Sequence, residues 1–153
     1  MPVDVVVETT ISRTPAEVAA FAADPSHAPQ WYANIRSVTW QTPPPTGIGS
    51  RMEFEAHFLR RRLVYTYEIV EFVPGQRLVM RTVGGPFPME TTYTWEPSDG
   101  GTRMTLRNRG EPSGFTRVAA PVMDRAIRRA TRKDLARLKS ILENAEKPVT
   151  QGL

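Results

Sequence analysis

The residues that could do chemistry in this chain are mainly tyrosines and threonines spaced two apart. Tyr65 and Tyr67, and then Thr91 and Tyr93, each fall on one face of an extended strand. The strand registers argued below add three more residues to the same inward face, Thr82, Trp95 and Asn108. Such polar groups in an apolar cavity can orient a ligand or donate to a developing oxyanion. They can equally be core residues whose polar tips bond each other or water.

Other kinds of site find less support. His27 and His57 stand thirty positions apart with no ligand pattern around them, and the chain has no cysteine. We therefore expect no metal site, no cofactor and no Ser-His-Asp arrangement. The loop GIGS at residues 47–50 lacks the Lys-Ser/Thr of a phosphate-binding loop and does not open a helix, so a tight inter-strand turn is expected there.

Length and composition are those of one globular domain. The chain has 153 residues, of which 40% are hydrophobic and 24% charged. We expect a single ligand-binding domain over residues 1–147 and a tail over residues 148–153. The N-terminus lacks a secretory pattern, and no apolar run approaches the roughly 20 residues that span a bilayer. The expected location is the cytoplasm.

The positive charge belongs to one segment. The net charge is +4, and residues 124–139 hold seven basic and two acidic side chains, which is 7 − 2 = +5. The basic residues lie opposite an apolar stripe, where a helix that faces solvent needs charge. No aromatics are interleaved for base stacking, so we expect no nucleic acid partner. We rank a solvated face first and a membrane-surface role second.

The order of elements predicts a strand, two short helices, six strands and a long helix. Thr14, Pro15 and Glu17 form a helix start of the capping-box type. The predicted strands cover residues 3–11, 36–41, 51–58, 63–73, 77–83, 89–96 and 102–109. The long helix is expected over residues 118–145. Short turns between consecutive strands imply an antiparallel sheet, whose apolar face and the helix must cover each other.

Charge predicts the register of two hairpins. If paired residues in the last hairpin sum to about 199, Glu96 faces Arg103 and Glu90 faces Arg109 on the outside. In the preceding hairpin Glu68 then faces Arg81. The same register leaves Glu71 on the inner face. Three potential acid/base residues point outward, which argues against a site made of Glu55, Glu90 and Arg107.

The chain resembles the START-like, or SRPBCC, superfamily, and within it the polyketide cyclase/dehydrase-type family. The similar motifs are spread over nearly the whole sequence. They are ISRTPAEV at 11–18, the segment 21–31 that ends in Trp31, GIGSR at 47–51, YEIVE and PGQRL at 67–78, the hairpin ETTYTWEP with DGGTR at 90–103, and the helix ending at 135–143. These are turns, caps and core positions, and none is a catalytic signature.

The resemblance implies an α+β helix-grip fold, in which a curved antiparallel sheet of about seven strands wraps around the long C-terminal helix. It also implies a ligand cavity, which favours reading the inward polar set as a lining. We expect a small hydrophobic ligand, lipid-like or polyketide-like, and a monomer or a homodimer. The expected ligand-binding residues are Trp31, Phe54, Tyr65, Tyr67, Met80, Thr91, Tyr93, Trp95, Leu106, Asn108, Met123 and Ile127.

Two other functions stay open. One is a cyclase or dehydratase acting on a poly-carbonyl substrate, with Tyr67 and Tyr93 as first candidates and no assigned catalytic residue. The other is a carrier that docks on a partner through the basic helix. For Trp31, the sequence leaves a roof over the cavity mouth and a plug at the end of the core as equal alternatives.

Overall fold

The computed structural model describes residues 3–111 and 120–145. The elements are β1 (Val3–Ile11), α1 (Pro15–Ala22), a 3-10 turn η1 (Pro25–His27), α2 (Ala28–Trp31), β2 (Ile35–Trp40), β3 (Arg51–Phe58), β4 (Arg61–Val73), β5 (Arg77–Gly84), β6 (Met89–Ser98), β7 (Gly101–Gly110) and α3 (Ala120–Asn144). The predicted order is confirmed, with strand ends that differ by one or two residues. Residues 118 and 119 of the expected helix and the tail from 148 lie outside the described residues.

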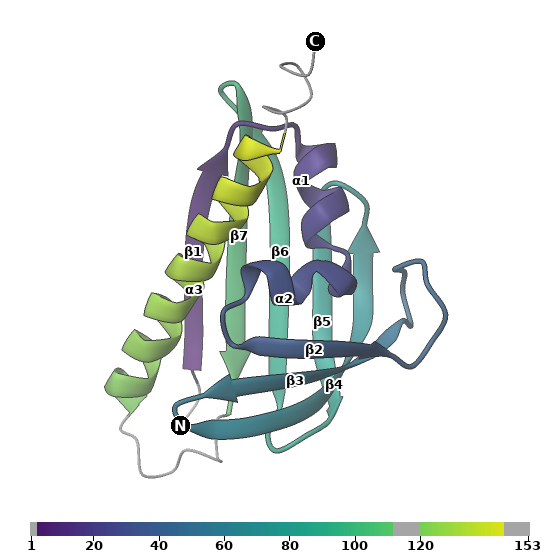
Figure 1. Ribbon diagram of the computed structural model, residues 1–153, viewed down its shortest axis with the longest axis vertical. Helices are drawn as coiled ribbons and strands as arrows, with labels where there is room; N and C mark the ends of the chain where they lie inside the picture. The colour runs from purple at the N-terminus through teal and green to yellow at the C-terminus, as the bar shows by residue number, and fades with distance from the viewer. Residues whose placement is uncertain (1–2, 112–119, 146–153) are drawn as a thin grey trace.

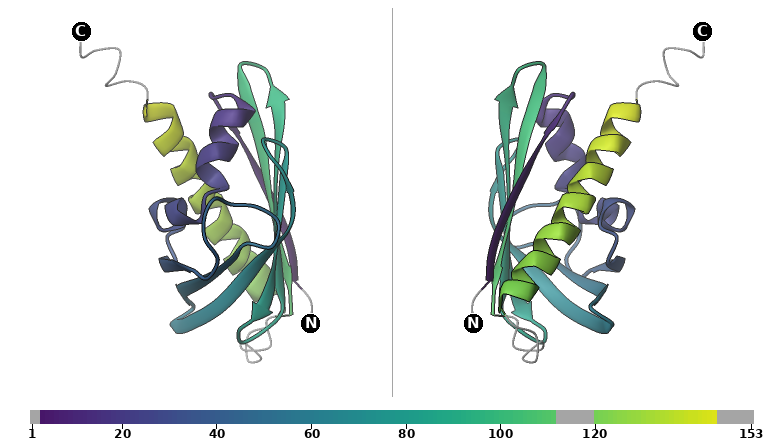
Figure 2. Two further views of the ribbon diagram at one scale, coloured as in Figure 1. Left: turned by 90° about the vertical axis from the view of Figure 1, so that its right-hand side faces the viewer. Right: turned by 90° about the vertical axis from the view of Figure 1, so that its left-hand side faces the viewer.

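Seven antiparallel strands form one sheet in the order β1-β7-β6-β5-β4-β3-β2. The sheet curls, so that β2, β3 and the start of β4 run across the other strands and enclose a concave side (Figure 1). Figure 2 shows α3 lying along that concave side. The architecture is therefore the helix-grip arrangement expected from the sequence.

The hairpin registers agree with the charge argument. Glu96 pairs with Arg103 and Glu90 with Arg109 across β6 and β7, and Glu68 pairs with Arg81 across β4 and β5. The outward face carries rows of ion pairs, such as Arg103–Glu96 at 3.0 Å. The three residues considered as an acid/base site lie in such pairs, with partners Arg62 for Glu55, Arg81 and Arg109 for Glu90, and Asp4 for Arg107.

The expectation that Glu71 lies on the inner face is wrong. A β-bulge between Ile69 and Glu71 shifts the pairing of β4 with β5 by one residue. One extra residue reverses the side to which the following side chains point. Glu71 is exposed as a result and pairs with Arg77 at 2.8 Å.

The first helix begins where its capping signal predicts. Thr14 Oγ1 accepts the backbone N–H of Glu17 at 3.2 Å, and Glu17 Oε1 accepts the N–H of Thr14 at 3.1 Å. This reciprocal pair satisfies two backbone donors that the helix start would otherwise leave open. The chain is thereby turned from β1 into α1, which contacts β6 and β7.

The C-terminal half of α3 is tied to the start of the chain. Its apolar stripe buries Leu135, Leu138 and Leu142. Arg13 donates to the carbonyl of Leu142 at 2.8 Å, and Glu143 accepts the backbone N–H of Ser12 at 2.9 Å. These contacts fix one end of the helix on the sheet.

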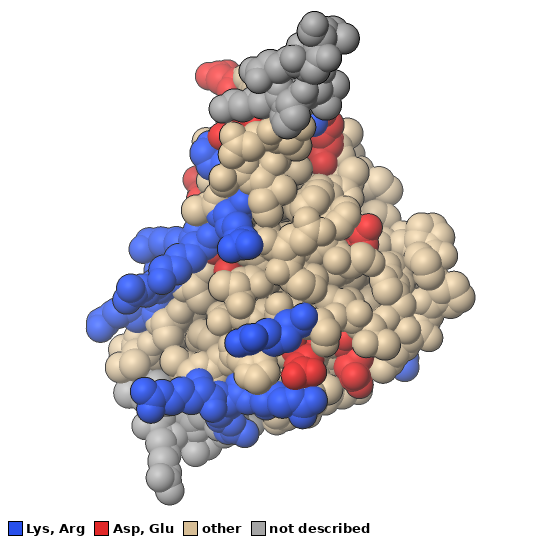
Figure 3. Space-filling model, viewed as in Figure 1, with Lys and Arg blue, Asp and Glu red and all other residues tan. Residues whose placement is uncertain are grey.

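The opposite side of α3 is basic and faces outward. Figure 3 shows a row of Lys and Arg side chains along this helix. Arg125, Arg129 and Arg132 are exposed, while Arg128 is half-buried and donates to the carbonyl of Val6 at 3.0 Å. No helix among the described residues has the length and apolar character needed to cross a bilayer.

Candidate functional site: an apolar cavity between sheet and helix

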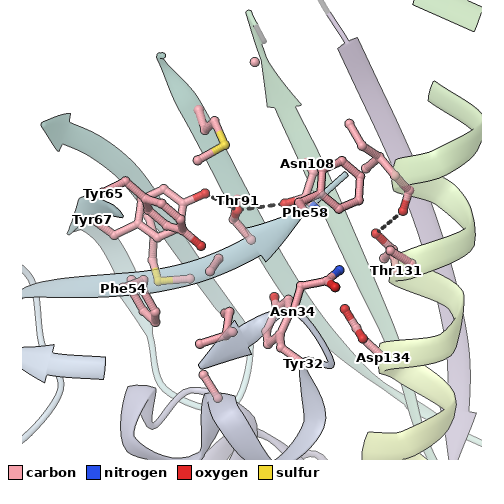
Figure 4. Close-up of a pocket in the computed structure, with 18 of the residues that line it drawn as sticks. Tyr32, Asn34, Phe54, Phe58, Tyr65, Tyr67, Thr91, Asn108, Thr131 and Asp134 are labelled. Carbon is pink, nitrogen blue, oxygen red and sulfur yellow. Dashed lines mark hydrogen bonds between the residues drawn. The ribbon is translucent and has the colours of Figure 1, made fainter. Parts of the chain in front are cut away.

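A cavity of about 180 Å³ lies between the concave face of the sheet and α3. Its wall combines side chains from β3 to β7 with others from α3 and from the segment around α2 (Figure 4). Several of the lining residues are partly exposed, among them Asn34, Phe58 and Ile127. Among the described residues, the cavity wall therefore reaches the surface, and the end of β3 and α3 both contribute to this partly exposed part.

Aromatic rings form one wall. The pairing of β3 with β4 sets Phe54 opposite Tyr65, with ring centroids 5.6 Å apart. Tyr67 lies edge-on to Tyr65 at 5.2 Å. Both tyrosines are inward because strand residues two apart share a face. The three rings are less than a tenth exposed, so they present a preformed apolar surface to the cavity.

A chain of hydrogen bonds crosses the floor of the cavity from β4 to β7. The hydroxyl groups of Tyr67 and Thr91 lie 2.7 Å apart, and Thr91 donates to Asn108 Oδ1 at 2.8 Å. Burial raises the pKa of Tyr67 to about 12, although its bond to Thr91 acts in the opposite direction. The Tyr67 phenol is therefore neutral at physiological pH and already has a partner.

A second polar contact joins α2 to the sheet. Tyr32 directly follows α2, and its hydroxyl lies 2.5 Å from that of Tyr93 on β6. Burial is the main cause that raises the pKa of both phenols above the ordinary value of 10. The Trp31 ring packs behind them, 4.2 Å from the Tyr32 ring and 5.8 Å from the Tyr93 ring.

The cavity wall also contains a buried carboxyl group. Asp134 of α3 is 5% exposed, and its Oδ1 accepts the backbone N–H of Ala33 at 3.1 Å. Burial raises the pKa of Asp134 from 3.8 to about 6, against the lowering effects of the Ala33 bond and the Arg137 charge. At physiological pH this side chain brings negative charge into a mostly apolar wall.

Most of the residues expected from the sequence line this cavity. They are Phe54, Tyr65, Tyr67, Met80, Thr91, Tyr93, Asn108, Met123 and Ile127. Their position in the wall is a structural finding, and their role in ligand binding stays a prediction.

The other three expected residues, Trp31, Trp95 and Leu106, are not part of the cavity wall. Each is at most 2% exposed and packs in the solid part of the core. The physical reason is that α1 and the C-terminal half of α3 pack directly on one end of the sheet, which leaves no room there for a cavity. Trp31 therefore plugs the core behind Tyr32, and Trp95 lies one step past Tyr93 on the same face of β6.

Several lining residues were not expected from the sequence, among them Tyr32, Asn34, Thr131 and Asp134. Tyr32 and Asn34 lie in a connection with no periodicity, so no pattern marks them. Asp134 did leave a signal. It stands seven residues after Ile127 and four before Leu138, which places a carboxylate within the apolar stripe of the helix.

The histidines do not contribute to this wall. His27 Nδ1 lies 2.9 Å from the carbonyl oxygen of Phe21. The His27 ring also stacks on the Phe21 ring, with the two centroids 4.2 Å apart. His57 is half-exposed beside Glu55. Within residues 3–111 and 120–145, no group of three or more His, Cys, Asp or Glu side chains is arranged to hold a metal ion.

Comparison with known sequences identifies a family. Residues 2–143 match the family described as "Polyketide cyclase / dehydrase and lipid transport". The uncharacterized protein Rv2574 of Mycobacterium tuberculosis is 29% identical over 129 residues, which cover 78% of this chain and 74% of that protein.

Solved structures share the fold. A START superfamily protein from Mycobacterium smegmatis superposes with a TM-score of 0.78 at 14% identity, covering 93% of this chain and 98% of that one. The ZhuI aromatase/cyclase from Streptomyces sp. R1128 gives 0.77 at 13% identity, covering 97% and 98%. The fold of these structures agrees with the match over nearly the whole chain, and the chain belongs to the polyketide cyclase / dehydrase and lipid transport family.

Proposed function

We propose that the protein binds a small hydrophobic ligand, lipid-like or polyketide-like, in the cavity between the sheet and α3. The observation that carries this proposal is the open cavity with its aromatic wall of Phe54, Tyr65 and Tyr67. An apolar cavity of about 150 Å³ can hold benzene. A volume of about 180 Å³ suits a ligand body of one or two rings, and longer ligands would extend through the opening.

The test compares two variants of the same helix. Ala130 lines the cavity, and Ala136 is exposed on the other side of α3. Calorimetric titration with naphthalene, which makes no hydrogen bonds, measures filling of the apolar space alone. We expect binding to the wild type and to Ala136→Trp, and a loss of at least tenfold in affinity for Ala130→Trp, whose indole occupies the space.

Two outcomes of these measurements bear directly on the proposal. Equal affinities of the two variants would place naphthalene elsewhere on the protein and contradict the proposal. Native mass spectrometry of freshly purified protein, followed by extraction, supplies an independent readout. A co-purifying hydrophobic molecule that is absent from Ala130→Trp would identify the natural ligand class.

A second candidate is a cyclase or dehydratase that uses Tyr67 and Tyr93. The observation in its favour is that both phenols lie in the cavity wall and stay protonated, so each can donate to a substrate carbonyl. Both hydroxyls already have partners, which is why binding is placed first. With a synthetic poly-β-carbonyl thioester, enzymatic aldol closure and loss of water would fall in Tyr67→Phe and Tyr93→Phe while naphthalene binding stays unchanged. Equal turnover in the variants would exclude this role.

A further inference from the structure

One part of the cavity wall has hydrogen-bonding capacity that the protein itself does not use. Asp134 Oδ1 accepts from Ala33, but Oδ2 takes part in no hydrogen bond or ion pair of the described residues. Figure 4 shows the carboxyl group projecting from α3 toward Asn34 and the cavity. Among the described residues, the polar side-chain atoms that are sealed from solvent without a partner are the indole nitrogens of Trp31 and Trp95, so Asp134 Oδ2 is an accessible acceptor on a buried side chain.

A purely structural role does not explain the carboxylate. An asparagine would accept the Ala33 N–H through its own oxygen without bringing charge into a buried position. Burial of a carboxylate is unfavourable unless hydrogen bonds compensate it, and one backbone donor compensates it only in part. The second oxygen is thus left without the partner that would complete the site.

The neighbouring side chains add to this capacity. Asn34, on the segment between α2 and β2, has an amide that forms no side-chain hydrogen bond among the described residues. Thr131, one turn before Asp134 on α3, donates its hydroxyl to the carbonyl of Ile127 at 2.8 Å and keeps a lone pair. Tyr32 completes this end of the cavity (Figure 4).

The other polar cluster described in the cavity wall, on β4, β6 and β7, offers a different kind of free group. Tyr67 and Thr91 share one hydrogen bond, and Thr91 donates to Asn108 Oδ1, which leaves the Asn108 amide NH₂ as the unused group there among the described residues. This place therefore offers the cavity an amide donor, whereas Asp134 offers a charged acceptor, and the difference gives the cavity a direction.

We propose that Asp134, with Asn34 beside it, binds a hydrogen-bond donor of the ligand, either a hydroxyl or an amine, and so orients the ligand with its polar end toward α3. This inference rests on the proposed function and narrows it to amphipathic ligands that carry a donor on an apolar ring system. A hydrogen bond to a charged acceptor discriminates strongly, because a ligand without the donor leaves the carboxylate buried and unpaired.

The test uses two probes of nearly equal size. 2-Naphthol carries a hydroxyl where 2-methylnaphthalene carries a methyl group. By calorimetry at pH 7.5, we expect the wild type to bind 2-naphthol about 10- to 100-fold more tightly than 2-methylnaphthalene. In Asp134→Asn the amide oxygen can still accept from Ala33, but its NH₂ group then faces the cavity, so the preference should fall to about threefold or less.

The control is the same substitution outside the cavity. Asp124→Asn changes a half-exposed residue of α3 that pairs with Arg128, and it should keep the wild-type preference. Equal affinity of the wild type for the two probes would overturn this inference and leave the proposed function intact. An unchanged preference in Asp134→Asn would also overturn it. Binding of neither probe to the wild type would overturn both proposals.

Discussion

The hydrogen bond between the Tyr32 and Tyr93 hydroxyls stabilises the packing of the α2 segment on the sheet. Two hydroxyl groups 2.5 Å apart hold the short helix segment against the sheet. Removal of one hydroxyl leaves the other without its partner, whereas removal of both leaves no orphan.

We expect Tyr32→Phe and Tyr93→Phe each to lower the free energy of unfolding by about 1 kcal/mol. The double variant should lose less than the sum of the two, with a coupling of about 1 kcal/mol. Urea unfolding of the wild type and the three variants measures this coupling. Strictly additive losses would show that the two hydroxyls do not depend on each other.

Asp134 makes stability depend on pH. Its pKa is raised from 3.8 to about 6 by burial, so the folded state holds the proton more tightly than the unfolded chain does. The resulting stabilisation is complete below about pH 4 and is lost as the pH rises through 6.

Asp134→Asn lacks this titration. Relative to the wild type, the variant should gain about 2 kcal/mol of unfolding free energy between pH 4 and pH 7.5. Urea unfolding at several pH values, with Asp124→Asn as the matched control, measures the difference. A constant gap between wild type and Asp134→Asn at all pH values would mean that the carboxyl titrates alike in both states.

The sequence found some site residues and missed others for a physical reason. Tyr67, Thr91 and Tyr93 could be placed because strand alternation fixes which way a side chain points. Trp95 satisfies the same alternation, yet lies beyond the hollow part of the sheet. Whether an inward residue meets a cavity or a packed neighbour depends on where α1 and α3 cross the sheet, and alternation carries no information about that.

At the level of elements, the turn between β3 and β4 is unusual. Phe58 pairs with Arg61, so Leu59 and Arg60 alone form the loop, with φ angles of 49° and 66°. Two-residue loops of this kind favour Asn-Gly, because both positions require left-handed backbone. Leu59 is 43% exposed there, so burial does not repay the strain.

The double substitution Leu59→Asn, Arg60→Gly should raise the free energy of unfolding by about 1 kcal/mol. The opposite change at the β4–β5 turn is the control. Gly75 has φ of 76° and open space around its Cα, so Gly75→Ala should lower stability by about 1 kcal/mol through conformation alone. Thermal unfolding measures both changes. A loss of stability in the Asn-Gly variant would show that Leu59 or Arg60 makes a contact worth more than the strain.

Element order and hairpin register could be predicted because local signals carry them. The capping box at Thr14 and the charge pairs of the last hairpin each act within a few residues or across one turn. The bulge at Glu71 left no such mark. It depends on how two strands fit the curvature of the sheet, which is a property of the assembled fold.

At the scale of the whole molecule, all four tyrosines of the chain lie around one cavity. Burial raises the pKa of each, with Tyr67 at about 12. The unfolded chain would release these protons near pH 10, so stability is complete below pH 10 and declines as the pH rises further.

We therefore expect no tyrosine ionisation with an ordinary pKa in the folded protein. Absorbance at 295 nm should stay flat through pH 10.5 and then rise in one step together with the loss of circular dichroism. The same titration in 8 M urea should show all four phenols titrating near pH 10. A gradual rise in the native protein near pH 10 would contradict the burial described for this cavity.

The pairing of β1 with β7 has a consequence during synthesis of the chain. Val3 lies beside Gly110 in the sheet, so β1, which is synthesised before the other six strands, finds its partner β7 only after all of them have been made. Its row of Val3, Val5 and Val7 is buried in the folded protein, where β1 contacts α3, an element that is synthesised later still. On the opposite face of the strand Asp4 and Glu8 flank the exposed Val6, and charge on an unpaired strand opposes association with other chains. The charged residues on the outward face of β1 thus also disfavour aggregation of the nascent chain before β7 is available to pair with β1.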